Sequence, residues 1–137
     1  MLKSLETLLK VARRKLDELG VEAVRIGQFA DQLKMQEASV LAREEAEVQA
    51  ASSDMVLAPL LPAYRMRVKR QLKDIRTQAQ EADASLALVR ERLNAAYQEK
   101  SKFEHLIEQE RIKAAMVRAA IEQAQMDEIA INRAGRG

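Results

Sequence analysis

The segment Asp-Met-Val-Leu-Ala-Pro-Leu-Leu-Pro, residues 54–62, decides how this chain folds. It holds the two prolines of the sequence, Pro59 and Pro62, and directly follows Ser52 and Ser53. A proline removes a backbone N–H donor and disfavours the helical conformation in the residue before it. Because the rest of the chain is periodic, residues 54–62 are predicted to form its single turn.

Before this turn, apolar residues recur at alternating intervals of three and four residues. The series begins with Leu2, Leu5, Leu9, Ala12, Leu16, Leu19, Ala23, Ile26, Ala30 and Leu33. It continues through Glu37, Val40, Glu44, Glu47 and Ala51, so it becomes partly acidic near the turn. This spacing predicts a helix over about residues 2–53 with one narrow apolar face, called the seam below.

The same spacing resumes after the turn and runs from Val68 to Ile131, where only Lys100, Glu110 and Glu128 interrupt the apolar series. A repeat of 3.5 residues held over this length specifies helices that wind around each other in a left-handed supercoil. The predicted fold is therefore all-α. Residues 1–137 are expected to form a single antiparallel left-handed coiled-coil hairpin, whose second and longer helix spans about residues 63–133.

The unequal helix lengths predict an unpaired end. If the turn centres near residue 59 or 60, facing residues have numbers that sum to about 119, and Leu2 lies opposite about Val117. An apolar stripe without a partner in its own chain must be covered by something else. Val117, Ile121, Ala124 and Ile131 are therefore predicted to contact another protein, with fraying or self-association as the alternative.

The turn is also strongly apolar for an exposed position, with Met55, Val56, Leu57, Leu60 and Leu61 inside it. Such residues either cap the end of the seam or contact a second partner. A tyrosine just after the turn, Tyr64, is compatible with both interpretations.

Composition limits the function. Of the 137 residues, 32% are charged, yet the chain has two Phe, two Tyr and no Trp, a mixture typical of long helices. The absence of Cys excludes disulfides and thiolate metal sites. No apolar run approaches the roughly 20 residues that span a bilayer, and the first residues lack a signal-peptide pattern. We therefore expect a cytoplasmic protein without direct membrane insertion.

No catalytic or metal site is predicted. His105 is the only histidine, and with Glu108 it forms a His-x-x-Glu pair. A carboxylate-bridged metal site needs further inward carboxylates and a second His from other helices. The chain also lacks a Cys nucleophile and a Gly-rich phosphate loop. We expect a solvated His105, no enzymatic activity and no cofactor.

Six basic residues lie close together after the turn: Arg65, Arg67, Lys69, Arg70, Lys73 and Arg76. Antiparallel pairing sets them against Glu37, Glu44, Glu45 and Glu47, so ion pairs that fix the register are the favoured interpretation. Contact with an acidic partner is the alternative. Nucleic acid is not expected, because no aromatic residue interleaves with these cations to stack on bases.

One segment near the C-terminus, Gln125–Ala130, resembles the (Leu/Met)-Asp-Glu-x-Ala segment that closes members of the flagellar export protein FliJ family. The opening segment Leu5–Leu9 is similar too, as is the tyrosine that enters the second helix. Chain length and a hairpin with a longer second helix also agree with this family.

The resemblance implies a soluble component of the flagellar type III export apparatus that looks like the central stalk of rotary ATPases. Such a protein is expected to sit in the pore of the hexameric export ATPase FliI, to promote its assembly and activity, and to contact the export-gate protein FlhA. It also handles export chaperones. Its expected place is the cytoplasm, peripherally associated with the inner-membrane export apparatus.

By position, the resemblance places both contacts on this chain. The ATPase side falls on the N-terminal residues and on Val117, Ile121, Ala124, Met126, Asp127, Ile129 and Ile131. The gate side falls on Tyr64, Val68, Leu72 and Ile75, of which the last three are also seam positions. Family members often have an aromatic where Arg67 and Val68 stand here.

Two other functions remain open at this point. The equivalent stalk protein of a virulence-type secretion system has the same features. A generic coiled-coil scaffold would also explain the periodicity, and it would self-associate and ignore ATPases.

Overall fold

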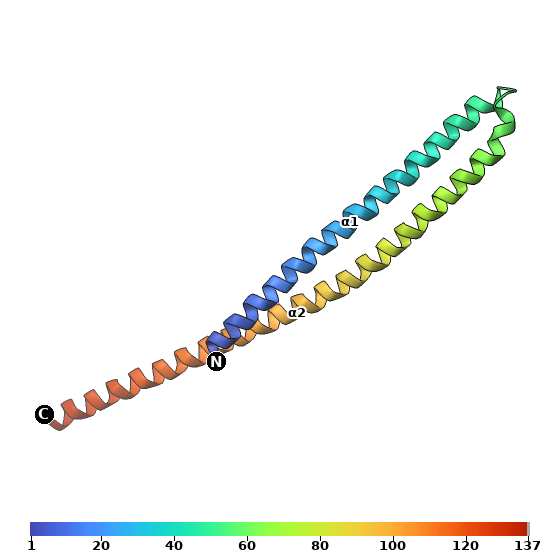
Figure 1. Ribbon diagram of the computed structural model, residues 1–137. Helices are drawn as coiled ribbons and strands as arrows, with labels where there is room; N and C mark the ends of the chain where they lie inside the picture. Colours follow the sequence, from blue (N-terminus) through green and yellow to red (C-terminus); the bar gives the residue numbers. More distant parts are fainter. Residues whose placement is uncertain (137) are drawn as a thin grey trace. The chain divides into compact units, whose positions relative to one another are not determined.

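The computed structural model describes residues 1–136, and two long helices account for almost all of them (Figure 1). Helix α1 spans Leu2–Ser52 and helix α2 spans Leu61–Arg136, with a short 3-10 helix, η1, over Ala58–Leu60. The helices pack antiparallel against each other, α2 is the longer, and the described residues contain no strand. The predicted all-α hairpin is confirmed.

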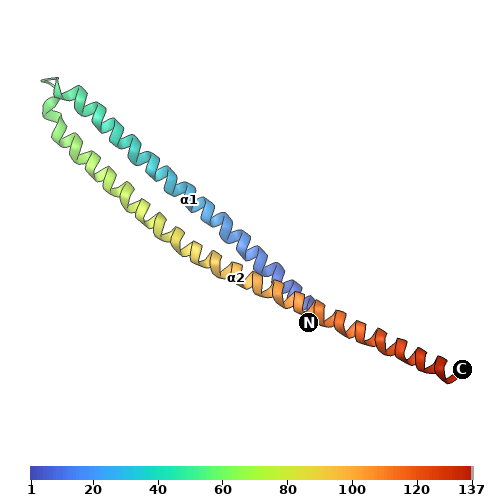
Figure 2. The ribbon, with the colours of Figure 1, turned by 180° about the vertical axis from the view of Figure 1, so that it is seen from behind.

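Contacts divide the chain into two compact units. One spans Asp17–Asn94 and contains the turn, and the other joins Met1–Leu16 to the chain from Ala95 onward. Each unit pairs a stretch of α1 with a stretch of α2, and the view from behind shows the same pairing (Figure 2). That residues 1–137 behave as a single domain stays a prediction. Over the described residues, neither helix is apolar for long enough to cross a membrane.

An aspartate directs the turn. The Oδ1 atom of Asp54 accepts the backbone N–H of Val56 at 2.8 Å and that of Leu57 at 3.4 Å. Its backbone oxygen accepts the N–H of Ala58 at 2.9 Å. Asp side chains stabilise turns in this way because the carboxylate replaces a backbone acceptor. The chain therefore leaves α1 within a few residues and enters η1.

Helix α2 begins at Leu61, before its predicted start at about residue 63. Its second residue is Pro62. The first four N–H groups of a helix have no partner within it, so a proline in the first turn loses no hydrogen bond. Pro62 therefore belongs to α2 and does not precede it. Pro59 lies in η1, within the predicted turn.

The core of the Asp17–Asn94 unit follows the predicted seam. Its centre is Leu33, which is 2% exposed and packs with Ala30, Ile75 and Ala82. Other buried residues of this unit are Ala51, Val68, Leu72 and Val89. Apolar side chains at intervals of three and four residues bury themselves because they line one face of each helix.

Near the turn, the seam departs from the predicted spacing. On α1 the partly buried position is Val48, whereas the predicted Glu47 is exposed. Val48 follows Glu44 by four residues, and Glu44 follows Val40 by four. Two successive intervals of four form a stutter, which locally unwinds the supercoil. The prediction for Glu47 was wrong because this local unwinding buries a valine in place of a carboxylate.

Helix α2 has a stutter at the same level. Tyr64, Val68 and Leu72 are successive buried or partly buried positions four residues apart. Val40, Tyr64 and Val68 line one groove, which places the two stutters opposite each other. Because both helices change spacing together, the seam stays continuous toward the turn.

In the other unit, the paired region is short. Leu9 and Ala12 of α1 are buried, as are Ala96 and Ile107 of α2. Glu110 is the last partly buried residue, and every described residue after it is exposed.

Two interhelical ion pairs define the register. Arg76 Nε lies 3.1 Å from Glu37 Oε1, and Arg111 Nη2 lies 4.0 Å from Glu6 Oε1. The residue numbers sum to 113 in the first pair and to 117 in the second, below the expected 119. Both sums place the centre of the turn closer to α1 than expected, in line with the early start of α2 at Leu61. Arg111 is the last residue of α2 with an ion pair to α1, and every described residue after it is exposed, so the overhanging part of α2 is taken to begin at Ile112, before the predicted Val117.

Candidate interaction surfaces

The unpaired part of α2, Ile112–Arg136, is called the overhang here. All seven residues predicted for the ATPase side lie on it and are exposed: Val117, Ile121, Ala124, Met126, Asp127, Ile129 and Ile131. Among the large apolar residues of this set, the exposed fraction runs from 52% for Ile121 to 70% for Ile131. The overhang therefore presents an apolar surface that no part of α1 covers.

The overhang has apolar residues on two opposite sides. One side continues the seam and holds Ala114, Val117, Ile121 and Ala124. At 100° per residue, the other side holds Ile112, Ala115, Met116, Ala119 and Met126. Between Ala114 and Met126 only Arg118 and Glu122 are charged. A helix that is apolar on opposite sides is normally surrounded by other protein.

Polar contacts on the overhang stay within the helix. Gln123 Nε2 donates a hydrogen bond to Asp127 Oδ1 at 3.1 Å, one turn further on. At the start of the overhang, Lys113 Nζ lies 3.9 Å from Glu110 Oε1. These local contacts leave both apolar sides open.

Three of the four residues predicted for the gate side are buried. Val68, Leu72 and Ile75 are 5–7% exposed and pack in the seam with α1. Tyr64 is half-buried and lines two grooves near the turn, one with Val40 and Arg43 and one with Leu57 and Leu60. Among these four residues, only Tyr64 has enough exposed surface for direct contact.

The turn presents an exposed apolar surface, called the tip here. Met55 is 94% exposed, Val56 79% and Leu60 62%. Among the apolar residues of the turn, only Ala58 and Leu61 are partly buried. The tip thus caps the seam with few of its side chains and leaves the larger ones in solvent.

The basic run does not pair with α1 as predicted. Within the described residues, Arg76 is the one member of the run with an ion pair, which it makes to Glu37. Lys69, Arg70 and Lys73 line a groove formed by residues of α2 alone. The favoured interpretation was wrong for these residues because they lie on the side of α2 that faces away from the seam.

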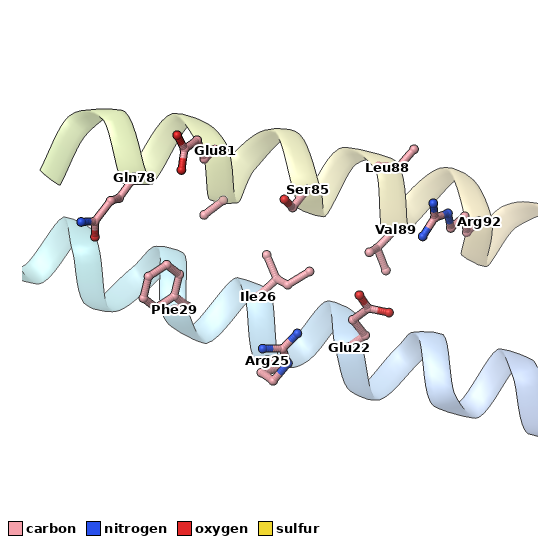
Figure 3. A pocket seen from close by; sticks show the side chains of 11 residues that line it. Glu22, Arg25, Ile26, Phe29, Gln78, Glu81, Ser85, Leu88, Val89 and Arg92 are labelled. Carbon is pink, nitrogen blue, oxygen red and sulfur yellow. The ribbon is translucent and has the colours of Figure 1, made fainter. Parts of the chain in front are cut away.

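A groove of about 440 Å³ lies between the helices in the Asp17–Asn94 unit (Figure 3). Ile26 and Val89 point toward the opposite helix, and Glu22 and Arg92 lie at one end. Its lining holds the hydroxyl of Ser85 and the carboxylates of Glu22 and Glu81, and it contains no histidine or cysteine. The groove therefore lies along the seam, to which Ile26 and Val89 belong.

The predicted solvation of His105 agrees with its exposed position on α2. Within residues 1–136, no three His, Cys, Asp or Glu side chains lie close enough together to hold a metal ion.

Sequence comparison identifies relatives over the whole chain. All 137 residues align at 30% identity with the flagellar FliJ protein of two strains of Caulobacter vibrioides, and the alignment covers 99% of those proteins. The chain belongs to the flagellar FliJ family. The resemblance inferred from Gln125–Ala130 is thereby confirmed. No family model and no solved structure matches this FliJ-family chain.

Sequence analysis missed the second apolar side of the overhang of this FliJ-family protein, and it gave contact with an acidic partner only as the alternative for the basic run. The second apolar side of the overhang is visible in the spacing of Ile112, Met116 and Ala119, which lie outside the seam series. The basic groove would follow from the same helical spacing applied to Met66, Lys69 and Lys73. Both surfaces lie away from the seam, so a search for seam residues passes over them.

Proposed function

We propose that this FliJ-family protein is a non-enzymatic component of the flagellar type III export apparatus, where it acts as a stalk and adaptor. The overhang inserts into the hexameric export ATPase (FliI-type), and the hairpin end contacts the export gate (FlhA-type). The observation that carries the proposal is the overhang, which is exposed throughout and apolar on two opposite sides.

A ring of subunits is the partner that best suits such a helix. A flat surface covers one side of a helix, whereas the centre of a ring covers several. Full burial of a Val, Ile or Met side chain is worth about 1.5–3 kcal/mol, and those of the overhang are about half exposed. Covering both sides therefore supplies more binding energy than covering the seam side alone.

At the gate side, the proposal divides the four residues by their burial. The half-buried Tyr64 makes direct contact, and Val68, Leu72 and Ile75 act by holding the start of α2 against α1. The exposed tip provides further apolar surface beside them, through Met55 and Val56. Export chaperones are further partners that the tip would suit.

The proposed place of action is the cytoplasm, at the periphery of the inner-membrane export apparatus, with neither nucleic acid nor direct membrane insertion involved. The flagellar relatives favour this system over a virulence-type secretion system.

The test is the ATP-hydrolysis rate of the cognate flagellar export ATPase in the presence of the full-length protein. The double variant Val117→Ser/Ile121→Ser removes apolar groups from the seam side of the overhang. Both side chains are exposed, so the hairpin stays folded. We expect the wild type to stimulate hydrolysis and the variant to lose most of the stimulation.

The matched control is Val21→Ser/Val24→Ser, which changes two exposed valines of α1, 71% and 61% accessible, outside the overhang. Stimulation by the control at the wild-type level, with loss in the overhang variant, supports insertion. Equal stimulation by all three proteins would refute the ATPase contact on the overhang. Absence of stimulation by the wild type would instead favour a scaffold function.

A further inference from the structure

A basic groove of about 500 Å³ runs along the exposed side of α2 just after the turn. Its lining includes Met66, Lys69, Arg70, Lys73, Arg76 and Gln80. Every lining residue belongs to α2, so the groove lies between long side chains of one helix and opens to solvent.

The positive charge of this groove is largely uncompensated. Between Leu61 and Gln80 the chain has six basic residues and one acidic residue, Asp74, which gives a net charge of +5. In the described residues only Arg76 has an ion pair, to Glu37. The three acidic residues of α1 nearest the turn, Glu44, Glu45 and Glu47, are not part of the lining. The groove thus carries cations that the fold leaves without anionic partners.

The cations follow helical spacing. Met66, Lys69, Lys73, Arg76 and Gln80 succeed one another at intervals of three and four residues, so they form one stripe along α2. The stripe is roughly 20 Å long at 1.5 Å per residue. A second helix alongside it would meet these cations with acidic residues at the same intervals. At one end Met66, 54% exposed, offers a flexible apolar contact.

Other anionic partners fit this stripe less well. A membrane-surface helix needs a broad apolar face beside its cations, and Met66 is the one large apolar residue of the lining. Single-stranded nucleic acid is held by aromatic side chains that stack on bases, and the lining contains none.

We propose that this groove binds an acidic helical segment of a partner protein, whose carboxylates contact Lys69, Arg70 and Lys73 and whose apolar residue packs on Met66. The proposal goes beyond the stalk function, because it identifies a separate binding surface on α2 and the chemistry of its partner. It does not depend on insertion of the overhang into an ATPase.

The test measures binding of fluorescent helical peptides to the full-length protein by anisotropy. Three acidic peptides of about 20 residues carry Glu and one Leu in three different helical registers, and a fourth carries Lys in place of Glu. The charge-reversed variant is Lys69→Glu/Lys73→Glu. The matched control, Lys34→Glu/Arg90→Glu, changes the net charge equally at two exposed residues that make no ion pair in the described part of the chain.

We expect at least one acidic peptide to bind the wild type saturably at about 0.15 M salt, and the Lys peptide not to bind. Charge reversal at Lys69 and Lys73 should weaken binding roughly thirtyfold, since each change removes an attraction and adds a repulsion. The control should bind as the wild type does.

Failure of all three acidic registers to bind would overturn the proposal. Equal weakening by the two charge variants would also overturn it, since net charge rather than the groove would then govern binding. A duplex oligonucleotide and anionic vesicles are measured in parallel. If either binds more tightly than the acidic peptides and depends on Lys69 and Lys73, the groove belongs to that class of partner instead. No ATPase is present, so these outcomes are independent of the stalk proposal.

Discussion

Two glycines lie inside α1 at positions where the fold has no need of them. Neither Gly20 nor Gly27 has a positive φ angle, and a Cβ atom built on either would meet no atom within 4 Å. Glycine weakens a helix because it loses more backbone entropy on folding than alanine does. Gly20→Ala and Gly27→Ala are therefore predicted to stabilise the hairpin.

The magnitude follows from the absence of contacts. A new methyl group without neighbours gains little packing energy, so the gain comes from helix propensity, about 0.8–1 kcal/mol at each site. The two positions are two turns apart on one helix, or about 10 Å, which is far enough for their effects to add. The double variant should therefore raise the free energy of unfolding by about 2 kcal/mol.

Urea unfolding followed by circular dichroism at 222 nm measures this gain. The control is Gly135→Ala, where the added Cβ is equally free of contacts but lies in the last turn of α2, which contributes little to the hairpin. Its effect should stay below about 0.3 kcal/mol because helix ends fray. A loss of stability in Gly27→Ala would refute the reasoning, since it would mean that another chain or segment approaches the backbone at this position.

Two further substitutions test the seam by the same urea unfolding measurement. Leu33→Ala should cost about 3 kcal/mol, because it opens a hole beside Ala30 and Ile75, whereas Leu8→Ala, at a residue that is 45% exposed, should cost less than about 1 kcal/mol. Similar losses at both positions would contradict the assigned seam. At the stutter, Val48→Ala should cost about 1 kcal/mol and Glu47→Ala less than about 0.5 kcal/mol. If Glu47→Ala cost more stability than Val48→Ala, Glu47 and not Val48 would occupy the seam position.

The proposed interaction surfaces of this protein differ in how they relate to stability. The overhang and the tip expose apolar groups that the hairpin does not use, so substitutions there should change binding and leave folding intact. Val68, Leu72 and Ile75 belong to the core, so changing them affects folding first. Binding studies of the gate side are therefore better directed at Tyr64 and the tip.

Much of the fold was predictable from the sequence because a two-helix hairpin depends on local patterns. The spacing of apolar residues predicts each helix and its buried face, and the prolines with Asp54 mark the turn. The seam positions from Leu9 to Leu33 and from Val68 to Ile107 are buried or partly buried as predicted. The segment Gln125–Ala130 indicated the FliJ family, which full-length relatives confirm.

The features that depend on how the two helices meet required the tertiary structure. Whether Glu47 or Val48 enters the seam is decided by matching stutters on α1 and α2, which a rule applied to one helix does not include. The start of the overhang depends on the register of the two helices, which the spacing of apolar residues along one helix does not determine and which the two interhelical ion pairs reveal. The basic run illustrates the same limit. Antiparallel pairing brings all six cations to the same level as acidic residues of α1, which suggested ion pairs for each of them. A side chain forms such a pair only when its position around the helix axis also faces the other helix. Lys69, Arg70 and Lys73 face away from α1.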